Sequence, residues 1–449
     1  MNEEPTDAER YPTLTEAGRA MLKHMSEHPS APLFRNRSGN RLLSEEVEAL
    51  RAYESDIATA PFTWSANHPP AWLEAFTAQL YAQVPFYREQ ESPASFRAIS
   101  TVHRGDLAAD IARFVPDSVP VERMINFRTT GTTGHPLVLP SHPVVAGRYL
   151  AYHKRALRRF GIEPGHGCGQ MGVMLIGMQR KCFTYVSVTP TMDESGLAKI
   201  NLHPDDWRNP ADRARYIDAM QPEVIAGDPI SFAALLELSL RHRPRALLSV
   251  SMALSPGLKA ALLDRFGCPV LDVYSMNEAG PLGVYDPGLG GHLLLQPGMY
   301  VEILDAEGRE LPKGQIGEIT LTGGFNFCLP LLRYRTGDHG AIDNSDAGPI
   351  ILELQGRRPV RFRTHRGGWI NNIDLTHALA PLPLSRYSVH QSMNGEVTLR
   401  LASTEMGYAA DAVARLSTAL LGGSVSIAAL DTEDKMLQYT TDLPGGLGT

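Results

Sequence analysis

The chain has 449 residues, of which 43% are hydrophobic and 20% are charged. These proportions exclude a disordered, collagen-like or coiled-coil chain. The formal net charge of −7 gives no sign of nucleic acid or an acidic membrane as the main partner. Four cysteines without a CxxC pair predict free thiols rather than a zinc site. No apolar run is long enough to span a membrane and the start lacks a signal-peptide pattern, so we expect a cytoplasmic protein.

The N-terminal part is predicted to be helical. One helical face carries four apolar side chains: Leu14, Ala17, Met21 and Met25. A second apolar stripe, which Pro85 ends, consists of Trp72, Phe76, Leu80 and Val84. Both follow the helical period, and we interpret residues 1–70 as an N-terminal helical extension.

From residue 120 to residue 355, short apolar runs alternate with helical stretches. Runs such as VIAG before SFAALLELSLRH (231–242), and CPVLDVYS after PGLKAALLDRF (256–266), predict buried strands between helices. Later runs, including YVEILD and GEITLTGG, predict β-hairpins. We therefore expect an α/β fold with mixed sheets in a large domain, 71–355, and a small α+β domain, 356–449.

Three polar motifs interrupt this pattern. The stretch RTTGTTGHP (128–136) has the glycines and hydroxyls of a phosphate-binding loop, without the lysine of a Walker loop. In VLDVYSMNEAG (270–280) a buried strand ends at Asn277 and Glu278, where a carboxylate suits Mg²⁺. In LLRYRTGDHG (331–340) Asp338 suits a pair of adjacent hydroxyls, such as ribose offers. Each motif alone also fits an ordinary turn or helix start.

Taken together, these motifs resemble those of the adenylate-forming superfamily of acyl-CoA synthetases, luciferases and peptide-synthetase adenylation domains. The stretches QVPFYRE (83–89), YSMNEAG (274–280) and LPLLRYRTGD (329–338) are most similar to the phenylacetate-CoA ligase branch. The resemblance runs from about residue 71 to the end. It implies a large ATP- and acyl-binding domain and a small mobile C-terminal lid domain.

The resemblance also assigns roles to residues. It places a loop over the β- and γ-phosphates of ATP, formed by Thr129, Thr130, Gly131, Thr132, Thr133 and Gly134. Tyr274 would flank adenine, Asn277 would lie near the α-phosphate, Glu278 would ligate Mg²⁺ and Asp338 would hold the ribose. At the C-terminal end it implies a nucleotide contact at the hinge by Arg357 and a catalytic ammonium from Lys435.

Some positions depart from the family pattern. The hinge sequence, usually GRxD, is Gly356-Arg357-Arg358-Pro359 here, and Pro359 limits the backbone swing at that point. Beside Lys435, the usual glycine and arginine are replaced by Asp434 and Gln438. These changes put the second half-reaction in more doubt than the first. An arginine-rich stretch at 357–366 fits either a solvated hinge or contact with the phosphates of CoA.

The acyl pocket is predicted from apolar residues near the second motif. The candidates are Met174, Phe183, Tyr185, Met252 and Met276. Methionine adapts to many shapes, so an apolar or aromatic acid is expected, although plain core is the alternative for these residues.

We therefore expect an ATP- and Mg²⁺-dependent ligase that adenylates a carboxylic acid, in particular an aryl acid, and transfers the acyl group to CoA. Alternative acceptors are an amine and a carrier-protein thiol, and a homodimer is an analogy with relatives. A second class of hypothesis is a degenerate protein that binds nucleotide and acid without transfer. A Walker-type NTPase is disfavoured by the missing loop lysine.

Overall fold

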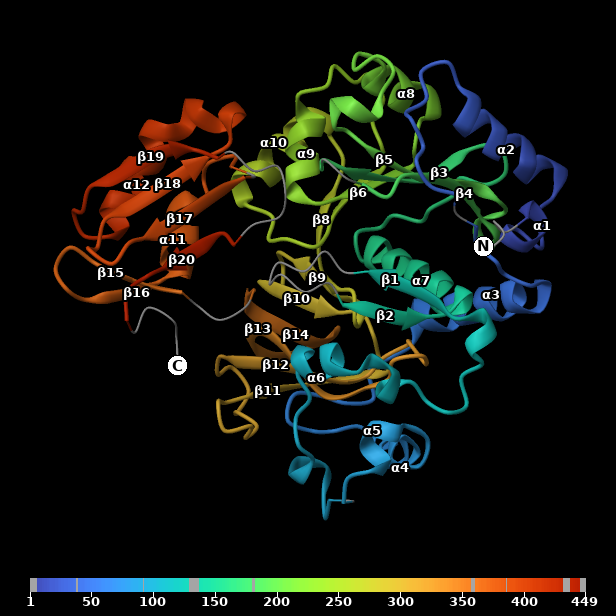
Figure 1. The fold of residues 1–449 in the computed structure, drawn as a ribbon, viewed down its shortest axis with the longest axis horizontal. Coiled ribbons are helices and arrows are strands. Elements are labelled where there is room, and N and C mark those ends of the chain that lie inside the picture. Colours follow the sequence, from blue (N-terminus) through green and yellow to red (C-terminus); the bar gives the residue numbers. More distant parts are fainter. Residues whose placement is uncertain are drawn as a thin grey trace.

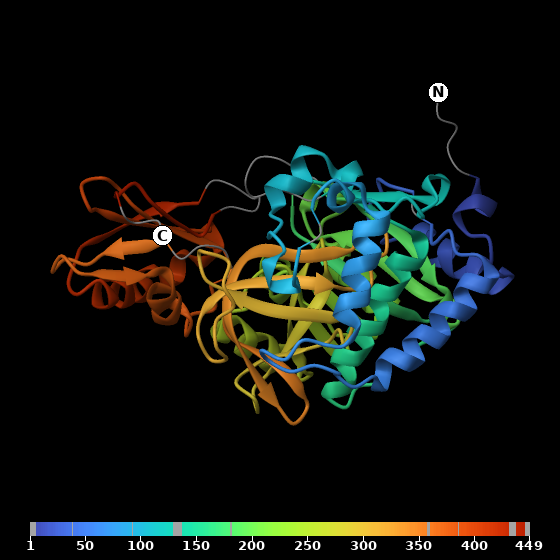
Figure 2. The same ribbon diagram turned by 90° about the horizontal axis from the view of Figure 1, so that it is seen from below.

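A computed structural model describes residues 6–37, 39–91, 93–128, 137–179, 182–356, 360–384, 386–430 and 437–444. A large body is formed by the residues up to 356, and a smaller C-terminal lobe stands at its side (Figures 1 and 2). The large body is built on one mixed sheet, which confirms the expected α/β fold.

Within the described ranges, this sheet has twelve strands. Their spatial order is β11 (Met299–Leu304), β12 (Gly317–Gly323), β13 (Leu331–Ser345), β14 (Gly348–Gln355), β10 (Gly291–Leu294), β9 (Gly280–Asp286), β8 (Val270–Met276), β7 (Ala246–Ser249), β6 (Val224–Gly227), β3 (Met171–Gly177), β5 (Ser195–Asn201) and β4 (Tyr185–Thr189). A separate hairpin consists of β1 (Ile125–Arg128) and β2 (Val138–Ser141).

Strand β8 joins two halves of this sheet. On one side it pairs in parallel with β7, and the parallel pairing continues through β6 and β3 to β5. On the other side it pairs antiparallel with β9, and antiparallel pairing continues to β11. Polar residues that follow β8 therefore lie beside loops from both halves.

Helices cover both faces of the parallel half. The helices of the large body are α1 (Asp7–Arg10), α2 (Glu16–Glu27), α3 (Ser44–Thr59), α4 (Trp72–Gln83), α5 (Pro85–Arg88), α6 (Arg104–Ala109), α7 (Pro143–Arg159), α8 (Asp212–Met220), α9 (Pro229–Leu236) and α10 (Pro256–Phe266). Helix α7 packs on one face, and α8, α9 and α10 pack on the other. Along β6, Ile225 packs in the core beneath α8, α9 and α10, whereas Val224 and Ala226 pack in the core beneath α7. Both faces of the strand are therefore buried, which explains why VIAG is apolar throughout.

Two details of the helix predictions were wrong. In α2, Met21 and Met25 are buried as expected, but Gly18 takes the inward position in place of the exposed Ala17. A Cβ on Gly18 would lie 2.6 Å from the carboxylate of Glu194, so a larger residue there would require the Glu194 side chain to move. Helix α9 ends at Leu236 instead of continuing to residue 242, because Asp218 accepts the backbone N–H groups of residues 241 and 242.

The C-terminal lobe has its own apolar core. Its elements are β15 (Arg361–Arg363), β16 (Trp369–Asn371), α11 (Asn372–Leu379), β17 (Tyr387–Gln391), β18 (Val397–Leu401), α12 (Ala409–Ala419), β19 (Val425–Ala429) and β20 (Tyr439–Thr441). The lobe touches the start of α10, where the N–H of Gly257 donates to the carbonyl of Ala380 at 2.9 Å.

The division at residues 70 and 355 stays a prediction. Residues of the first seventy belong to the cores of the large body, with Met25 in the core of the parallel half and Trp64 in the core of the antiparallel half. Among the helices in the described ranges, none is long and apolar enough to cross a membrane.

Helix α2 provides a test of this packing. Met25 is fully buried, and a Cβ on Gly196 of β5 would lie 3.0 Å from its sulfur. We expect Met25→Ala to lower the free energy of unfolding by about 2–5 kcal/mol, because it leaves a cavity between α2 and the sheet. Urea denaturation measures this change. The control Lys23→Ala, on the exposed face of the same helix, should stay within about 0.5 kcal/mol of the wild type; equal effects would contradict the packing.

Candidate active site

Tyr274 and Asp338 are joined by a hydrogen bond. Tyr274 lies near the end of β8, and its Oη donates to Asp338 Oδ2 on β13 at 2.8 Å. Burial, followed by the nearby charge of Asp338, raises the pKa of Tyr274 well above its usual value. The phenol therefore remains a neutral donor. Two residues that the sequence assigned to one nucleotide, 64 positions apart, are in direct contact.

The backbone around Asp338 is shaped by a bulge in β13 that contains Gly337. Its φ of +80° lies in the left-handed region, which glycine adopts without strain. The N–H of Gly337 donates to Glu318, and the hydroxyl of Thr336 accepts the N–H of Asp338 at 3.0 Å. Gly356 lies close by, since a Cβ added there would be 3.7 Å from Asp338 Oδ1.

Glu278 lies just beyond the end of β8, and its residue is only 5% exposed. Arg104, the first residue of α6, forms an ion pair with its Oε1. Tyr334 of β13 donates to the same oxygen at 3.4 Å. Within the described ranges no hydrogen-bond donor reaches Oε2, so one carboxylate oxygen is left for a cation.

The neighbouring residue Asn277 is exposed, and its carbonyl accepts a hydrogen bond from Tyr149 of α7 at 3.3 Å. This contact fixes the turn between β8 and β9 to α7, which packs on the face of the sheet opposite to α10. The turn is therefore held from β13, α6 and α7.

A carboxylate and an imidazole lie behind Tyr274. Asp272 Oδ2 is 3.9 Å from His292 Nε2 of β10, and the rings of His292 and Tyr274 are edge to face at 6.4 Å. Burial raises the pKa of Asp272 to about 7, although Lys259 acts in the opposite direction. Burial, together with Lys259, lowers the pKa of His292 to about 4, so this imidazole is neutral at physiological pH.

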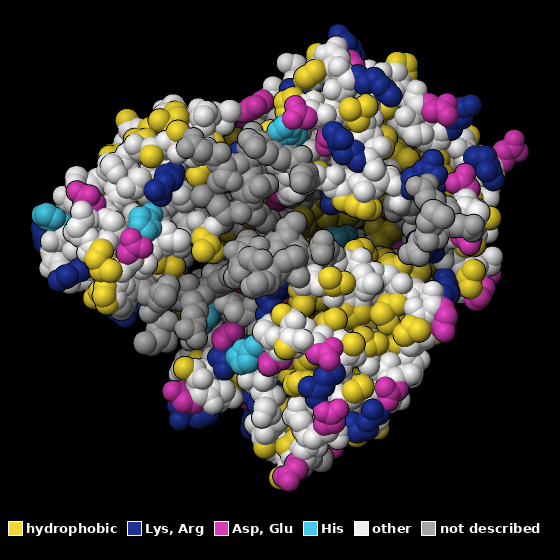
Figure 3. Space-filling model, in the orientation of Figure 1, with side chains coloured by type: hydrophobic (Ala, Val, Ile, Leu, Met, Phe, Trp, Pro, Cys, Tyr) yellow, Lys and Arg dark blue, Asp and Glu magenta, His cyan; other side chains and the backbone are white. Residues whose placement is uncertain are grey.

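Several predicted site residues lie outside the described residues. They are Thr129, Thr130, Gly131, Thr132, Thr133, Gly134, Arg357 and Lys435. Their roles stay predictions. Strands β1 and β2 flank the Thr/Gly-rich stretch and expose Phe127 and Val138, at 44% and 39%. Hydrophobic side chains gather on this face of the molecule (Figure 3).

The predicted acyl-pocket residues lie in different surroundings. Phe183 is 53% exposed, and its ring is 5.6 Å from that of Tyr185. Met174 is fully buried in the core between the sheet and α8 to α10, as the plain-core alternative expected. Met252 is partly exposed in the turn before α10, and Met276 packs on the core of the antiparallel half. The acyl pocket therefore stays a prediction.

Sequence reasoning did not find the partners of Glu278. Arg104 lies 174 residues before it, in a stretch with no motif. Tyr334 lies inside the third motif, and the alternation of strand residues places it on the same face as Thr336 and Asp338 in a regular strand. That alternation is the one signal that pointed toward Tyr334.

Residues 170–327, which include β8 and the turn holding Glu278, match the AMP-binding enzyme family. This stretch is similar to an AMP-binding enzyme domain. It contains the second of the three motifs, and phenylacetate-coenzyme A ligases are among the proteins to which the chain is similar.

Three relatives illustrate the range of similarity. The chain is 33% identical over 147 residues to oxalate–CoA ligase of Saccharomyces cerevisiae, covering 28% of this chain and 25% of that protein. It is 32% identical over 111 residues to a phenylacetate-coenzyme A ligase of Pseudomonas putida, covering 22% and 24%. A phenylacetate-coenzyme A ligase of Thermus thermophilus is 24% identical over 314 residues, covering 64% and 67%. The chain thus spans about a quarter of the length of the first two.

A solved structure supports the fold. 2-Hydroxyisobutyryl-CoA ligase, in the postadenylation state in complex with R3-HIB-AMP, superimposes with a TM-score of 0.59 at 18% identity. The match covers 85% of this chain and 91% of that one. The likeness in fold therefore extends well beyond residues 170–327.

The buried carboxyl of Asp272 predicts a pH effect on stability. The pKa of Asp272 rises from 3.8 to about 7 on folding. Between these two pH values the folded chain therefore keeps a proton that the unfolded chain has released. The carboxyl therefore lowers stability as pH rises toward 7. We expect the free energy of unfolding of Asp272→Asn, relative to that of the wild type, to increase by about 1–2 kcal/mol as the pH rises from about 5 to about 8.

Urea midpoints across this range measure the effect. Asp346→Asn, in the exposed turn between β13 and β14, is the control and should follow the wild-type pH profile. Parallel profiles for Asp272→Asn and the wild type would contradict a raised pKa at Asp272.

Proposed function

We propose that this protein is an ATP-dependent carboxylic acid ligase, acting on an aryl acid, that forms an acyl-adenylate and passes the acyl group to CoA. The observation that carries the proposal is the meeting of Tyr274, Asp338 and Glu278 at the end of β8, inside and beside the AMP-binding domain. Ligands of open α/β sheets bind beyond the carboxyl ends of the strands, which is where these groups lie.

The geometry fits a nucleotide at this edge. Asp338 would accept the two ribose hydroxyls, and its hydrogen bond from Tyr274 orients the carboxylate for this contact. Tyr274 would flank the adenine with the part of its ring that faces away from β13. The Thr/Gly-rich residues 129–134 would donate hydrogen bonds to the β- and γ-phosphates, as the resemblance implies.

Glu278 also fits a magnesium ion. Mg²⁺ is usually bound through one or two carboxylates together with substrate phosphates, and Glu278 supplies one buried carboxylate with Oε2 available. When bound, the ion would supply positive charge to the phosphate oxygens. Glu278 would hold it through Oε2, while Tyr334 and Arg104 would orient the carboxylate through Oε1.

In the adenylation step, the carboxylate of the acid attacks the α-phosphorus and pyrophosphate leaves. Lys435 would place its ammonium near the oxygens where negative charge develops. In the second step the thiol of CoA attacks the acyl carbon and AMP leaves. Both steps need a site from which water is excluded, which the C-terminal lobe would provide.

Acid-dependent exchange of labelled pyrophosphate into ATP tests the proposal, run without acceptor across a panel of aryl and alkyl acids. We expect exchange with aryl acids, and thioester formation once CoA is added. Lys435→Ala and Glu278→Gln should each lower the exchange rate by about 100-fold or more, because each removes a charge that acts on the transition state.

Lys313→Ala is the matched control, since Lys313 is exposed and pairs with Asp343 toward the end of β13. Its exchange rate should equal that of the wild type. Absence of exchange with every acid, in a protein that binds ATP, would overturn the proposed function in favour of a degenerate nucleotide-binding protein.

Arg104 should help to orient Glu278 for magnesium. Its ion pair holds Oε1 and leaves Oε2 for the ion. We therefore expect Arg104→Gln to raise the half-saturating Mg²⁺ concentration of the exchange reaction by about ten-fold, because the carboxylate loses a contact that fixes it. Arg113→Gln, which breaks the exposed pair with Glu89, should leave this concentration unchanged. An unchanged or lower magnesium requirement in Arg104→Gln would contradict this role.

A further inference from the structure

Arg333 is a buried arginine near the start of β13. Its side chain is 3% exposed, and it forms an ion pair with Glu302 of β11, which is 1% exposed. The guanidinium also donates to the carbonyls of Arg97 and Ile99 at 2.9 and 2.7 Å. Nothing in the proposed chemistry uses Arg333 directly, yet its donors tie β13 to the segment 97–102.

The backbone of Arg333 has an unusual conformation. Its φ is +45°, in the left-handed region that costs a residue with a side chain roughly 1 kcal/mol or more. The pairing of β12 with β13 changes register here, because Leu321 pairs with Tyr334 whereas Gly323 pairs with Leu331. Arg333 is therefore part of a β-bulge. Such bulges redirect the side chains that follow them.

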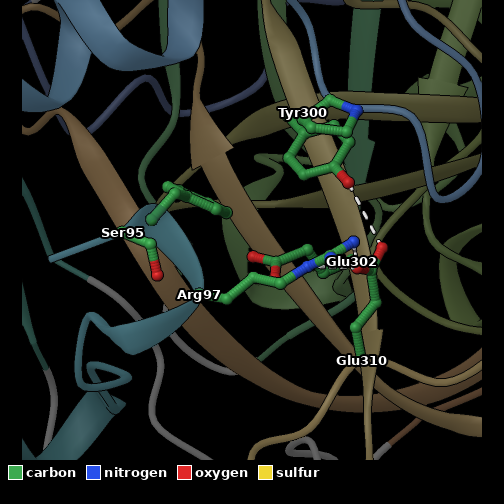
Figure 4. Close-up of a pocket in the computed structure, with 7 residues that line it drawn as sticks. Ser95, Arg97, Tyr300, Glu302 and Glu310 are labelled. Atoms are coloured by element: carbon green, nitrogen blue, oxygen red, sulfur yellow. Dashed lines mark hydrogen bonds and ion pairs between the residues drawn. The ribbon is translucent and has the colours of Figure 1, made fainter.

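A pocket lies beside Glu302, the ion-pair partner of Arg333. A cavity of about 320 Å³ is lined by Pro69, Ser95, Phe96, Arg97, Tyr300, Glu302 and Glu310. Arg97, Glu302 and Glu310 converge in it, and Tyr300 donates to Glu310 at 3.3 Å (Figure 4). Arg97 forms an ion pair with Glu310, so the charge of Glu310 is already balanced. Arg333 thus keeps Glu302, at the wall of this pocket, as its ion-pair partner.

Two connections run from Arg333 to Glu278. The first is along β13, where the next residue, Tyr334, donates to Glu278 Oε1. The second is through the segment 97–102: the carbonyl of Arg333 accepts the N–H of Val102, and the N–H of Arg335 donates to the carbonyl of Val102. Two residues beyond Val102, Arg104 makes the ion pair with the same oxygen.

We propose that Arg333 is the positioning residue of the Glu278 carboxylate, because it fixes the bulge that aims Tyr334 and the segment that delivers Arg104. This inference rests on the proposed function for its kinetic readout. It assigns no contact between Arg333 and substrate. Its prediction is that Arg333 acts on the reaction only through Arg104 and Tyr334.

Arg333→Lys is the main variant, since it keeps the charge beside Glu302 but cannot reach both carbonyls of the segment. In the wild-type background we expect the pyrophosphate exchange rate to fall about ten-fold or more. In the Arg104→Gln/Tyr334→Phe background, Arg333→Lys should lower the exchange rate by less than about three-fold, because the two side chains through which Arg333 acts have already been removed. An equal factor in both backgrounds would overturn the proposal.

Lys154→Arg is the matched control. Lys154 forms another buried ion pair, with Glu54, between α7 and α3, and this variant also keeps the charge. Its effect on exchange should be the same factor in both backgrounds. If Arg333→Lys does not fold, Glu302→Gln replaces it, because that change frees the guanidinium without adding a charge. It is held to the same two-background comparison.

Hydrogen exchange of backbone amides separates this inference from the proposed function. Arg333→Lys should exchange faster than the wild type in peptides that cover 99–106 and 331–338, and Lys154→Arg should not. This readout needs no substrate. If the wild type shows no pyrophosphate exchange, the proposed function fails while the amide result still decides the role of Arg333; unchanged amides at both segments would overturn it.

Discussion

Strand β8 is the constraint on which the site depends. Helices cover both faces of the sheet on its parallel side, and it pairs antiparallel on its other edge, so the interior of β8 is mostly apolar, with Asp272 as an exception. The groups assigned to the nucleotide and the metal therefore gather toward its end. The same strand brings loops from two differently connected halves of the sheet to one place, which is why Glu278 meets residues from β13 and α6.

The surroundings of Glu278 show how a buried carboxylate is held ready for a cation. Arg104 and Tyr334 both bind Oε1, and this leaves Oε2 without a donor from the described residues. A carboxylate with both oxygens occupied would have to lose a strong contact before binding a metal. Here the side chain keeps its orientation on one oxygen while the other remains open. The desolvation of Glu278 is thus offset by contacts on one side only.

Much of the fold and part of the site could be predicted from the sequence. Periodic apolar patterns located α2, α4 and the strands around β8, and the motifs located Tyr274, Glu278 and Asp338. What could not be predicted depends on tertiary contacts. Helix α9 stops early because Asp218, on another helix, takes the amides of residues 241 and 242. The approach of Arg104 to Glu278 depends on a bulge in a third element, and no local pattern encodes it.

The contact between the large body and the C-terminal lobe depends on one glycine. A Cβ on Gly257 would lie 2.5 Å from the carbonyl carbon of Leu382, so the C-terminal lobe rests against bare backbone at the start of α10. A single methyl group at residue 257 would clash with the backbone of Leu382. It would lift the lobe from this resting place while leaving Tyr274, Asp338 and Glu278 untouched. The absence of a side chain at residue 257 thus permits the close approach of the lobe to α10 that the structure shows.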